Sequence, residues 1–591
     1  MNATQNLDVG IRILVILNGA WHLLRHDLGR DLSRSATRGR AGPATSPAQI
    51  GIPRPASSLP VVRFCTLLTR TRWTTLAKGR RPATSVGKCA RSRAMSTLTL
   101  DTVSHYRGRG FAHTHDTPLL IRHHSQKECR YVVIAPWLDF MTRWNEGKVT
   151  AAELTDWQTT ALRAVLGHVH SKSPFYRRRL AGVNLDIKDL ADLAHIPYTT
   201  KDDLRDAMHG MLSGTVADAQ FYFETTGTTG RPTPCPRSAM DFDLNVAPLA
   251  HALDLIVRKH FTDDGERPIL AVVAPNDVHA ACLSLSFAAK QIGIAKLDLF
   301  PITPTLGFAR FFEVLVELRI NMILCSPGLL MALAEMSSSY GVEVPDDLAV
   351  KVLLTTGEMC SDGMGRLLAQ TWNADVYNFM YGSQEAGCPA VTRPDGTVVA
   401  IEPTYLLEVL DLETETTLGI EGYGELCLTT LVPGLKPLIR YRTGDLVSIA
   451  PDSTGRRTVK VLGRVKDMTD LGGRKRSAAE IDNTILADPE LIYGYELEVH
   501  AVGGQDRVHV RVKAKEGADH DQLKALVAGR VTAAFGVPAE VTIHPLLDLK
   551  SATGGWVSWK TARIKDRRAQ ETDDIETRSA ADLARAVEQA I

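Results

Sequence analysis

At 591 residues, with 44% hydrophobic residues and a formal net charge of +1, the chain is longer than a typical single domain and has ample apolar content for a large core. The charge is unevenly distributed: residues 1–94 hold fourteen Arg and two Lys against three Asp, a balance of +13, so the remaining residues carry −12. The mildly acidic remainder argues against a nucleic-acid-binding protein.

The nine cysteines are scattered, with no Cys-x-x-Cys pair and no histidine cluster at metal-ligand spacing. This pattern predicts a reducing, cytoplasmic environment and no structural zinc site. No apolar run reaches the ~20 residues that a membrane-spanning helix needs. The nearest, residues 11–24, is interrupted by Arg12, Asn18 and His22, and no basic segment precedes it as in a signal peptide. We therefore expect no membrane partner.

Residues 1–130 are expected to be a basic, disordered extension. The stretch from Ser33 to Arg93 is rich in Arg, Ser, Thr, Pro and Gly and shows neither helical nor strand periodicity, so it cannot bury a core. Three explanations stay open: a start codon assigned too far upstream, an Arg- and Ser-rich targeting peptide, or a basic tail. The first is favoured, because Met95 opens a more ordinary sequence.

The chain that follows alternates between helical and strand patterns. Helices are predicted at residues 151–168, behind Thr150 as a cap, and at 279–293 and 308–318, and buried strands at 268–274 and 350–356. This alternation predicts a doubly wound α/β fold, in which ligands gather at the carboxyl ends of the strands. Thr356-Gly357-Glu358 and Tyr381-Gly382 each come just past a predicted strand, where a nucleotide is expected to bind.

After Gly463 the pattern changes to a smaller α+β unit. It has predicted strands at residues 495–502, 508–514 and 540–544 and a helix at 519–535. Residues 578–591 form an amphipathic pattern that suits docking or oligomer packing.

One glycine- and threonine-rich stretch is a candidate phosphate-binding loop. Its members, which can point N–H and O–H donors at one anion, are Thr225, Thr226, Gly227, Thr228, Thr229 and Gly230. Such a turn can also simply close a hairpin. A kinase-type P-loop is excluded, because Arg231 stands where that motif requires Lys.

Further segments follow in a fixed order: Thr356-Gly357-Glu358, Tyr381-Gly382-Ser383-Gln384-Glu385, Tyr441-Arg442-Thr443-Gly444-Asp445, Gly463-Arg464-Val465-Lys466-Asp467 and Lys560-Thr561-Ala562-Arg563. Over roughly residues 135–568 this set resembles the adenylate-forming (AMP-binding) enzymes. The segments Ser173–Arg177 and Ile196–Leu204 are similar to the phenylacetate–CoA ligase branch. The resemblance implies a large AMP-binding domain over residues 131–462 and a smaller, mobile C-terminal domain over residues 463–591.

The resemblance also implies roles for individual residues. Residues 225–230 would hold the β- and γ-phosphates of ATP, with Thr226 among the catalytic groups, and Glu385 would bind Mg²⁺. Asp445 would take both ribose hydroxyls, Gly357 and Glu358 would contact adenine, and Arg464 would lie near the ribose and phosphates. Tyr381, Gly382, Ser383 and Gln384 would complete the nucleotide site, Lys466 would be the hinge between the domains, and Lys560 would be the catalytic lysine.

The chain departs from the family pattern at two of these segments. Gln384 stands where relatives have Thr or Ser, so either its amide or the Ser383 hydroxyl would reach the α-phosphate. Trp559 replaces the usual Gly before Lys560, and Lys565 is close enough to compete for the catalytic role.

The implied function is ATP-dependent activation of a carboxylic acid as an acyl-adenylate, with release of pyrophosphate, followed by transfer to CoA. An aryl or small apolar acid is expected, in a pocket lined by residues 377–382 and 275–285, and a homodimer is common in the branch. A second hypothesis changes the acceptor to an amine, a carrier-protein thiol or nitrite for diazotisation, as in relatives of secondary metabolism. A third is a catalytically silent nucleotide-binding module.

Overall fold

The structure is a computed structural model in which residues 127–225, 231–262, 265–275, 278–303, 305–544 and 563–568 are described. The chain divides into two units, residues 1–115 and 116–591, and every described residue belongs to the second. The predictions for residues 1–126 and for a helix at 578–591 therefore lie outside the described residues. None of the helices in the described ranges is long and apolar enough to cross a membrane.

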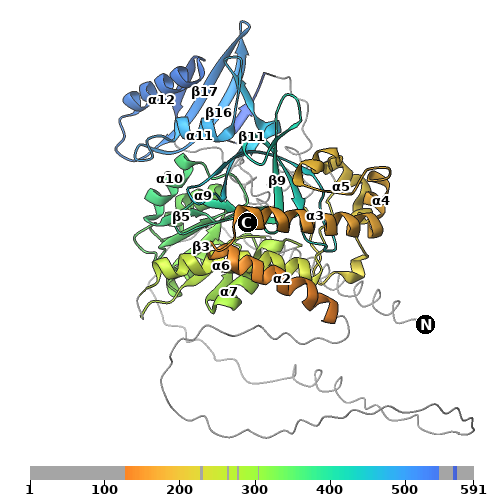
Figure 1. Ribbon diagram of the computed structural model, residues 1–591. Helices are drawn as coiled ribbons and strands as arrows, with labels where there is room; N and C mark the ends of the chain where they lie inside the picture. The colour runs from red at the N-terminus through yellow and green to blue at the C-terminus, as the bar shows by residue number, and fades with distance from the viewer. Residues whose placement is uncertain are drawn as a thin grey trace, which may run out of the picture. The chain divides into compact units, whose positions relative to one another are not determined.

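A five-stranded parallel sheet forms the centre of the fold (Figure 1). Its order is β2-β1-β3-β4-β5, with β1 Ile269–Val272, β2 Ala295–Asp298, β3 Met322–Cys325, β4 Val352–Thr355 and β5 Asp375–Asn378. Alternate residues of β1 belong to two different buried hydrophobic clusters. Leu270 and Val272 pack with α6 (Ala239–His260) and α7 (Ala280–Ile292). Ala271 packs with α8 (Gly307–Glu317), α9 (Pro327–Met336) and α10 (Asp362–Trp372). Both faces are thus covered by helices, which confirms the doubly wound α/β prediction.

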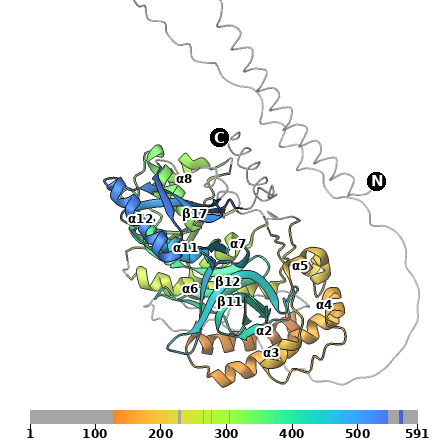
Figure 2. The same cartoon turned by 90° about the horizontal axis from the view of Figure 1, so that it is seen from above.

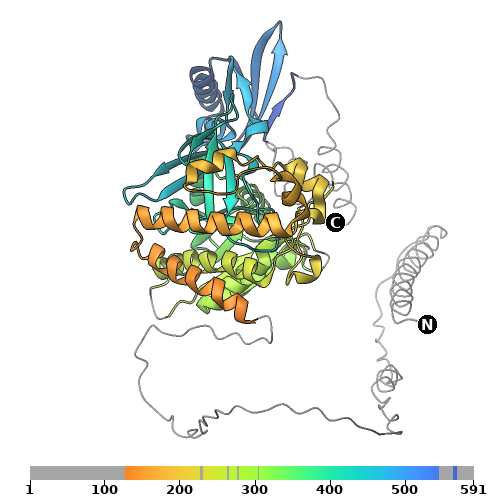
Figure 3. The ribbon, with the colours of Figure 1, turned by 45° about the vertical axis from the view of Figure 1, so that its right-hand side comes forward.

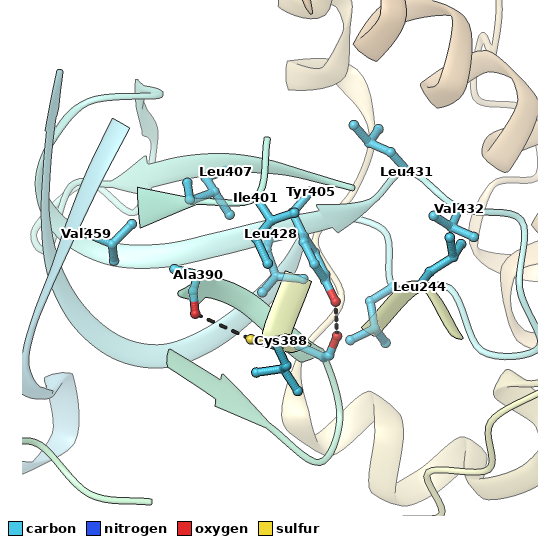
Figure 4. Packing of buried hydrophobic residues seen from close by; sticks show 14 of the residues in the cluster. Leu244, Cys388, Ala390, Ile401, Tyr405, Leu407, Leu428, Leu431, Val432 and Val459 are labelled. Carbon is cyan, nitrogen blue, oxygen red and sulfur yellow. Dashed lines mark hydrogen bonds between the residues drawn. The ribbon is translucent and has the colours of Figure 1, made fainter. Parts of the chain in front are cut away.

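The second sheet has eight strands in the order β10-β9-β11-β12-β13-β8-β7-β6. Their bounds are β6 Met380–Ser383, β7 Gly387–Thr392, β8 Val398–Ala400, β9 Tyr405–Leu410, β10 Thr417–Gly419, β11 Gly422–Thr430, β12 Tyr441–Pro451 and β13 Arg457–Arg464. Figure 4 shows side chains of this sheet, among them Tyr405 and Leu428, in the same buried cluster as Leu244 of α6. The sheet therefore shares one core with the helices of the parallel sheet. Tyr381 and Gly382, predicted just past a strand, lie inside β6 itself.

The helices that precede α6 in the described chain lie beside the eight-stranded sheet. They are α2 Lys127–Asn145, α3 Ala151–Lys172, α4 Pro174–Arg179 and α5 Lys201–Ala207, and Figures 1 and 3 show α3, in orange, crossing in front of the strands. The indole of Trp137 donates to the Thr404 hydroxyl at 3.1 Å, and that of Trp157 donates to the Pro403 carbonyl at 2.9 Å. Thr150 closes a capping box at the start of α3, so the predicted cap is confirmed.

Short 3-10 turns link these elements: η1 Leu190–His195, η2 Met208–Met211, η3 Val216–Asp218, η4 Ser337–Tyr340 and η5 Val465–Asp467. The turn η2 contacts both α4 and α5, which lie next to one another in Figure 2. This turn, which directly follows α5, thereby links α5 to α4.

The C-terminal part is a four-stranded sheet, β18-β17-β16-β19, with two helices. The bounds are β14 Thr469–Leu471, β15 Arg474–Arg476, α11 Ala478–Ile485, β16 Ile492–Val502, β17 Gln505–Ala514, α12 His520–Phe535, β18 Ala539–Ile543 and β19 Ile564–Asp566. The strands and the helix predicted for residues 495–544 are confirmed within a few residues at each end. Its core is continuous with that of α8, α9 and α10.

The buried carboxylate of Asp482 ties this part to α10. Asp482 is 1% exposed and accepts hydrogen bonds from the Ser361 hydroxyl at 3.1 Å and the Arg563 guanidinium at 3.0 Å. Tyr495 donates to its other oxygen. Because a buried charge pair that loses one partner costs about 3–5 kcal/mol, Asp482 fixes Arg563 firmly. Arg563 is three residues after Lys560 in the chain.

Candidate active site

The glycine- and threonine-rich stretch lies at the end of a small hairpin. Isolated bridges pair Phe221 with Arg237 and Glu224 with Pro234, and the Thr233 amide donates to the Thr225 hydroxyl at 2.9 Å. Residues 226–230, which hold Thr226, Gly227, Thr228, Thr229 and Gly230, lie outside the described residues, so their predicted contacts with phosphate stay predictions. Of the predicted loop only Thr225 is described, and its hydroxyl closes the hairpin.

Arg237 joins this hairpin to the Tyr381–Glu385 segment. Arg237 is 9% exposed, and its guanidinium donates to the carbonyls of Gln384 at 2.8 Å and Glu385 at 3.0 Å. Charge-assisted bonds of this kind are among the strong ones in proteins. The base of the candidate phosphate loop and the candidate metal ligand are therefore held in one frame. Arg237 was not predicted from the sequence, because no motif marks it.

Glu385 is a buried carboxylate surrounded by cations. The residue is 6% exposed, and its Oε1 lies 3.6 Å from Lys201 Nζ. Burial acts to raise the pKa of Glu385, but the charge of Lys201, followed by a backbone hydrogen bond and the charges of Lys436 and Arg464, outweighs burial and holds the pKa below its ordinary value. Glu385 is therefore ionised at neutral pH, as a metal ligand must be.

Lys201 reaches Glu385 from the first turn of α5. The Thr199 amide donates to the Arg440 carbonyl at 2.9 Å, and the Arg442 amide donates to the Thr199 carbonyl at 2.9 Å, so Thr199 forms a parallel bridge with Tyr441, the first residue of β12. Thr200 then caps α5 through a capping box. In the sequence, Ile196–Leu204 indicated only a similarity to the phenylacetate–CoA ligase branch. The lysine within this segment was the one feature that could have marked Lys201 as a site residue.

Asp445 and Arg464 face each other across β12 and β13. Arg464 Nε lies 2.9 Å from Asp445 Oδ1, and the Tyr381 hydroxyl donates to Asp445 Oδ2 at 2.6 Å. Burial, followed by the charge of Asp445, holds the pKa of Tyr381 well above its usual range, so this hydroxyl remains a donor. Each carboxylate oxygen of Asp445 is thus held by one donor, Arg464 on Oδ1 and Tyr381 on Oδ2.

Arg464 connects the two carboxylates, because its charge acts on Glu385 as well as on Asp445. The structure thus brings together four residues predicted from distant segments: Tyr381, Glu385, Asp445 and Arg464. Ser383 lies in the same segment as Glu385, where its hydroxyl accepts from the Ala386 amide at 3.1 Å.

Gly357 and Glu358 follow β4, at the carboxyl end of the parallel sheet. Gly357 has a φ of 89°, which favours glycine, and the Glu358 carboxylate accepts from the Gly328 amide at 2.6 Å. Glu358 therefore caps the start of α9, a role that its sequence position did not reveal. The charge of Glu358 also acts on Arg563. Burial lowers the pKa of Arg563, but Asp482, Tyr495 and Glu358 raise it by more, so the pKa lies above its ordinary value.

Of the predicted lysines, only Lys466 and Lys565 are described. Lys466 is exposed in η5, the turn that follows β13. Lys565 lies in β19 opposite Glu498 of β16. Lys560 and Trp559 lie outside the described residues.

The predicted acyl-pocket segments are partly occupied by structural contacts. Burial lowers the pKa of His279 to about 4, so the ring is neutral at pH 7, and its Nδ1 accepts from the Ala281 amide at 3.4 Å at the start of α7. Tyr377 is 3% exposed, and its hydroxyl accepts from Lys259 at 2.7 Å. Its place in an acyl pocket stays a prediction.

Comparison with known proteins supports the resemblance. No family model matches the chain. The phenylacetate-coenzyme A ligase of Aromatoleum evansii is 26% identical over 444 residues, covering 72% of this chain and 97% of that protein. The enzyme of the same name from Thermus thermophilus is 26% identical over 447 residues, covering 70% of this chain and 96% of that protein. The predicted likeness to phenylacetate–CoA ligases is confirmed.

The fold has a counterpart among solved structures. A 2-hydroxyisobutyryl-CoA ligase in its postadenylation state, in complex with R3-HIB-AMP, superposes with a TM-score of 0.60 at 19% identity, covering 74% of this chain and 93% of that one. This similarity bears on the fold and confirms the arrangement of a large α/β part and a smaller C-terminal part.

Gly382 offers a test of how tightly the site is built. A Cβ at this position would lie 2.5 Å from the Gly387 carbonyl oxygen, a backbone atom of the adjacent strand. We expect Gly382→Ala to separate β6 from β7 and to lower the free energy of unfolding by about 1–3 kcal/mol, measured by urea denaturation. The control is Gly365→Ala, in α10, where a Cβ meets nothing within 4 Å. Equal stability of the two variants would contradict the close approach.

Proposed function

We propose that the protein is an ATP-dependent, AMP-forming acid–CoA ligase. A carboxylate oxygen of the acid attacks the α-phosphorus of ATP, and the bond to pyrophosphate breaks. The thiolate of CoA then attacks the acyl carbon of the adenylate and AMP leaves. The observation that carries the proposal is the buried, ionised Glu385 beside the Asp445–Arg464 pair, at the base of the threonine-rich hairpin. The names of the similar ligases support it.

The nucleotide is proposed to bind across the carboxyl end of the parallel sheet. Asp445 would accept both ribose hydroxyls, held in place by Tyr381 and Arg464. Gly357 and the backbone beside Glu358 would contact adenine, since the Glu358 carboxylate is engaged by Gly328. The hairpin residues 225–230 would hold the phosphates.

The site also fits a magnesium ion. Mg²⁺ keeps several waters and needs only one or two protein carboxylates, so a single ionised Glu385 suits it, together with substrate phosphate oxygens. The ion supplies charge neutralisation to the phosphates when bound. Lys201, Lys436 and Arg464 add fixed positive charge around the same carboxylate, and this excess favours a polyphosphate ligand.

Lys560 is proposed to place its ammonium at the α-phosphate and acid oxygens as the adenylate forms. Lys466 would be the hinge about which a small domain, residues 463–591, moves against a large domain, residues 131–462, before CoA enters.

Acid-dependent ATP–pyrophosphate exchange, repeated with CoA and with hydroxylamine over a panel of aryl and alkyl acids, tests the proposal. Exchange together with CoA thioester formation is the expected result. Exchange without a thioester would favour an amine, a carrier-protein thiol or nitrite as the acceptor. No exchange with any acid would favour a silent nucleotide-binding module.

Replacing Lys560 with Ala separates the two half-reactions. We expect acid-dependent pyrophosphate exchange to fall by about 100-fold or more, because an electrostatic group is lost at the reacting phosphate. Thioester formation from preformed acyl-adenylate should change much less. Lys565→Ala is the matched control, since Lys565 lies in β19. Undiminished exchange in Lys560→Ala, or its loss in Lys565→Ala, would overturn the assignment.

Replacing Lys201 with Met should alter the pH profile. Lys201 depresses the pKa of Glu385, and a depressed carboxylate loses its charge only as pH falls through the lowered value. Without Lys201 the pKa rises, so Glu385 becomes protonated, and unable to hold Mg²⁺, at a higher pH. The acid limb of the pyrophosphate-exchange profile should therefore move to higher pH.

The control for this experiment is Lys188→Met, at an exposed lysine upstream of α5. An acid limb that is the same in Lys201→Met and Lys188→Met would show that the Lys201–Glu385 pair does not govern the carboxylate.

A further inference from the structure

Arg440 lies just before β12 in a strained backbone conformation. Its φ is 44°, in the left-handed region, which is unfavourable for a residue with a long side chain. The residue is 3% exposed, and its guanidinium grips both carboxylate oxygens of the buried Glu408 in β9, with Nε 3.0 Å from Oε2 and Nη2 2.7 Å from Oε1. Backbone strain and buried charge both cost free energy, and they persist where the surrounding structure requires them.

The other donors of Arg440 are directed at the segment that leads into α5. Nη1 donates to the carbonyls of Ala194 at 3.1 Å and Ile196 at 2.7 Å, and Nη2 also donates to the Tyr198 hydroxyl at 3.0 Å. The guanidinium carbon lies 4.0 Å from the centre of the Tyr198 ring. Because a guanidinium presents its N–H groups in a rigid, planar fork, this one side chain holds three points of the segment in place relative to β9.

The backbone of Arg440 continues the same connection towards the nucleotide site. Its carbonyl accepts from the Thr199 amide at 2.9 Å. Thr200 then caps α5, and Lys201 is the first residue of that helix. The Lys201 ammonium lies 3.6 Å from the Glu385 carboxylate. Since consecutive Cα atoms are a fixed distance of about 3.8 Å apart, the place of Lys201 follows from the place of Thr199.

We infer that Arg440, through its pair with Glu408, is a positioning residue for the nucleotide site. It holds the start of α5 so that the Lys201 ammonium stands against Glu385. A shift of about 1 Å caused by a change far from the reacting atoms can lower a rate by about 100-fold. The inference rests on the proposed function and deepens it by naming the buried pair that places one of the cations of the site.

A residue that only stabilises the fold and a residue that acts through Lys201 differ in one measurable respect. In the first case, loss of the Arg440 contacts changes the reaction by the same factor whether or not Lys201 is present. In the second case, this loss adds little once the Lys201 ammonium is removed, because no charge is left to misplace. Residues that act through one another show such non-additive effects in a double-mutant cycle.

The test is a double-mutant cycle of Arg440→Lys and Lys201→Met, read out as kcat/KM for ATP in pyrophosphate exchange. Arg440→Lys keeps a positive charge beside Glu408 but lacks the planar fork, so it cannot make all the contacts of the guanidinium at once. We expect kcat/KM to fall by about 10-fold when Lys201 is present and by less than about twofold in the Lys201→Met background.

A milder variant keeps the test decisive if Arg440→Lys does not fold. Tyr198→Leu removes the hydroxyl and the ring that contact Arg440 but keeps an apolar side chain. We expect it to lower kcat/KM by about threefold when Lys201 is present and to have no effect in the Lys201→Met background.

The matched control is Arg457→Lys. Arg457 of β13 pairs with the buried Glu402 at 3.1 Å, so this variant perturbs another buried ion pair and should change kcat/KM by the same factor in both backgrounds. Equal factors in both backgrounds for Arg440→Lys, or for Tyr198→Leu where the first variant does not fold, would overturn the inference while leaving the ligase function intact. Absence of exchange with every acid in the parent protein would instead remove the proposed function.

Discussion

The site depends on one buried carboxylate that stays ionised. Glu385 is almost fully enclosed, and an isolated charge in such a place would be neutralised by protonation. The charges of Lys201, Lys436 and Arg464 prevent this together with a backbone hydrogen bond to the carboxylate, because their combined effect outweighs the cost of burial. The surrounding structure can be understood as the means of holding these cations in place.

Each cation is fixed by a different part of the chain. Lys201 comes from α5, which is attached to β12 through Thr199. Lys436 is 2% exposed and donates to the Pro234 carbonyl at 2.6 Å, beside the threonine-rich hairpin. Arg464 comes from β13 and is paired with Asp445. Because segments so distant in sequence meet at one carboxylate, the order of the two sheets and the first helices must be complete before the site exists.

Much of the fold could be predicted from the sequence, because local patterns determined it. The helical spacing after Thr150, the apolar runs at 268–274 and 350–356 and the alternation at 495–514 all correspond to the observed elements. The convergence of Glu385 and Asp445 came from the family resemblance, since nothing in their spacing requires it. Contacts between distant segments were not predictable: Arg237 carries no motif, Lys201 was hidden in a family signature, and the capping of α9 by Glu358 depends on tertiary structure.

The central claim is that these residues bind a magnesium nucleotide between Glu385 and Asp445. Diffraction from crystals grown with Mn²⁺ and a non-hydrolysable ATP analogue tests it most directly. The account predicts an anomalous peak beside the Glu385 carboxylate, with the ribose hydroxyls on Asp445. A nucleotide bound elsewhere, or an occupied nucleotide site with its metal away from Glu385, would contradict it.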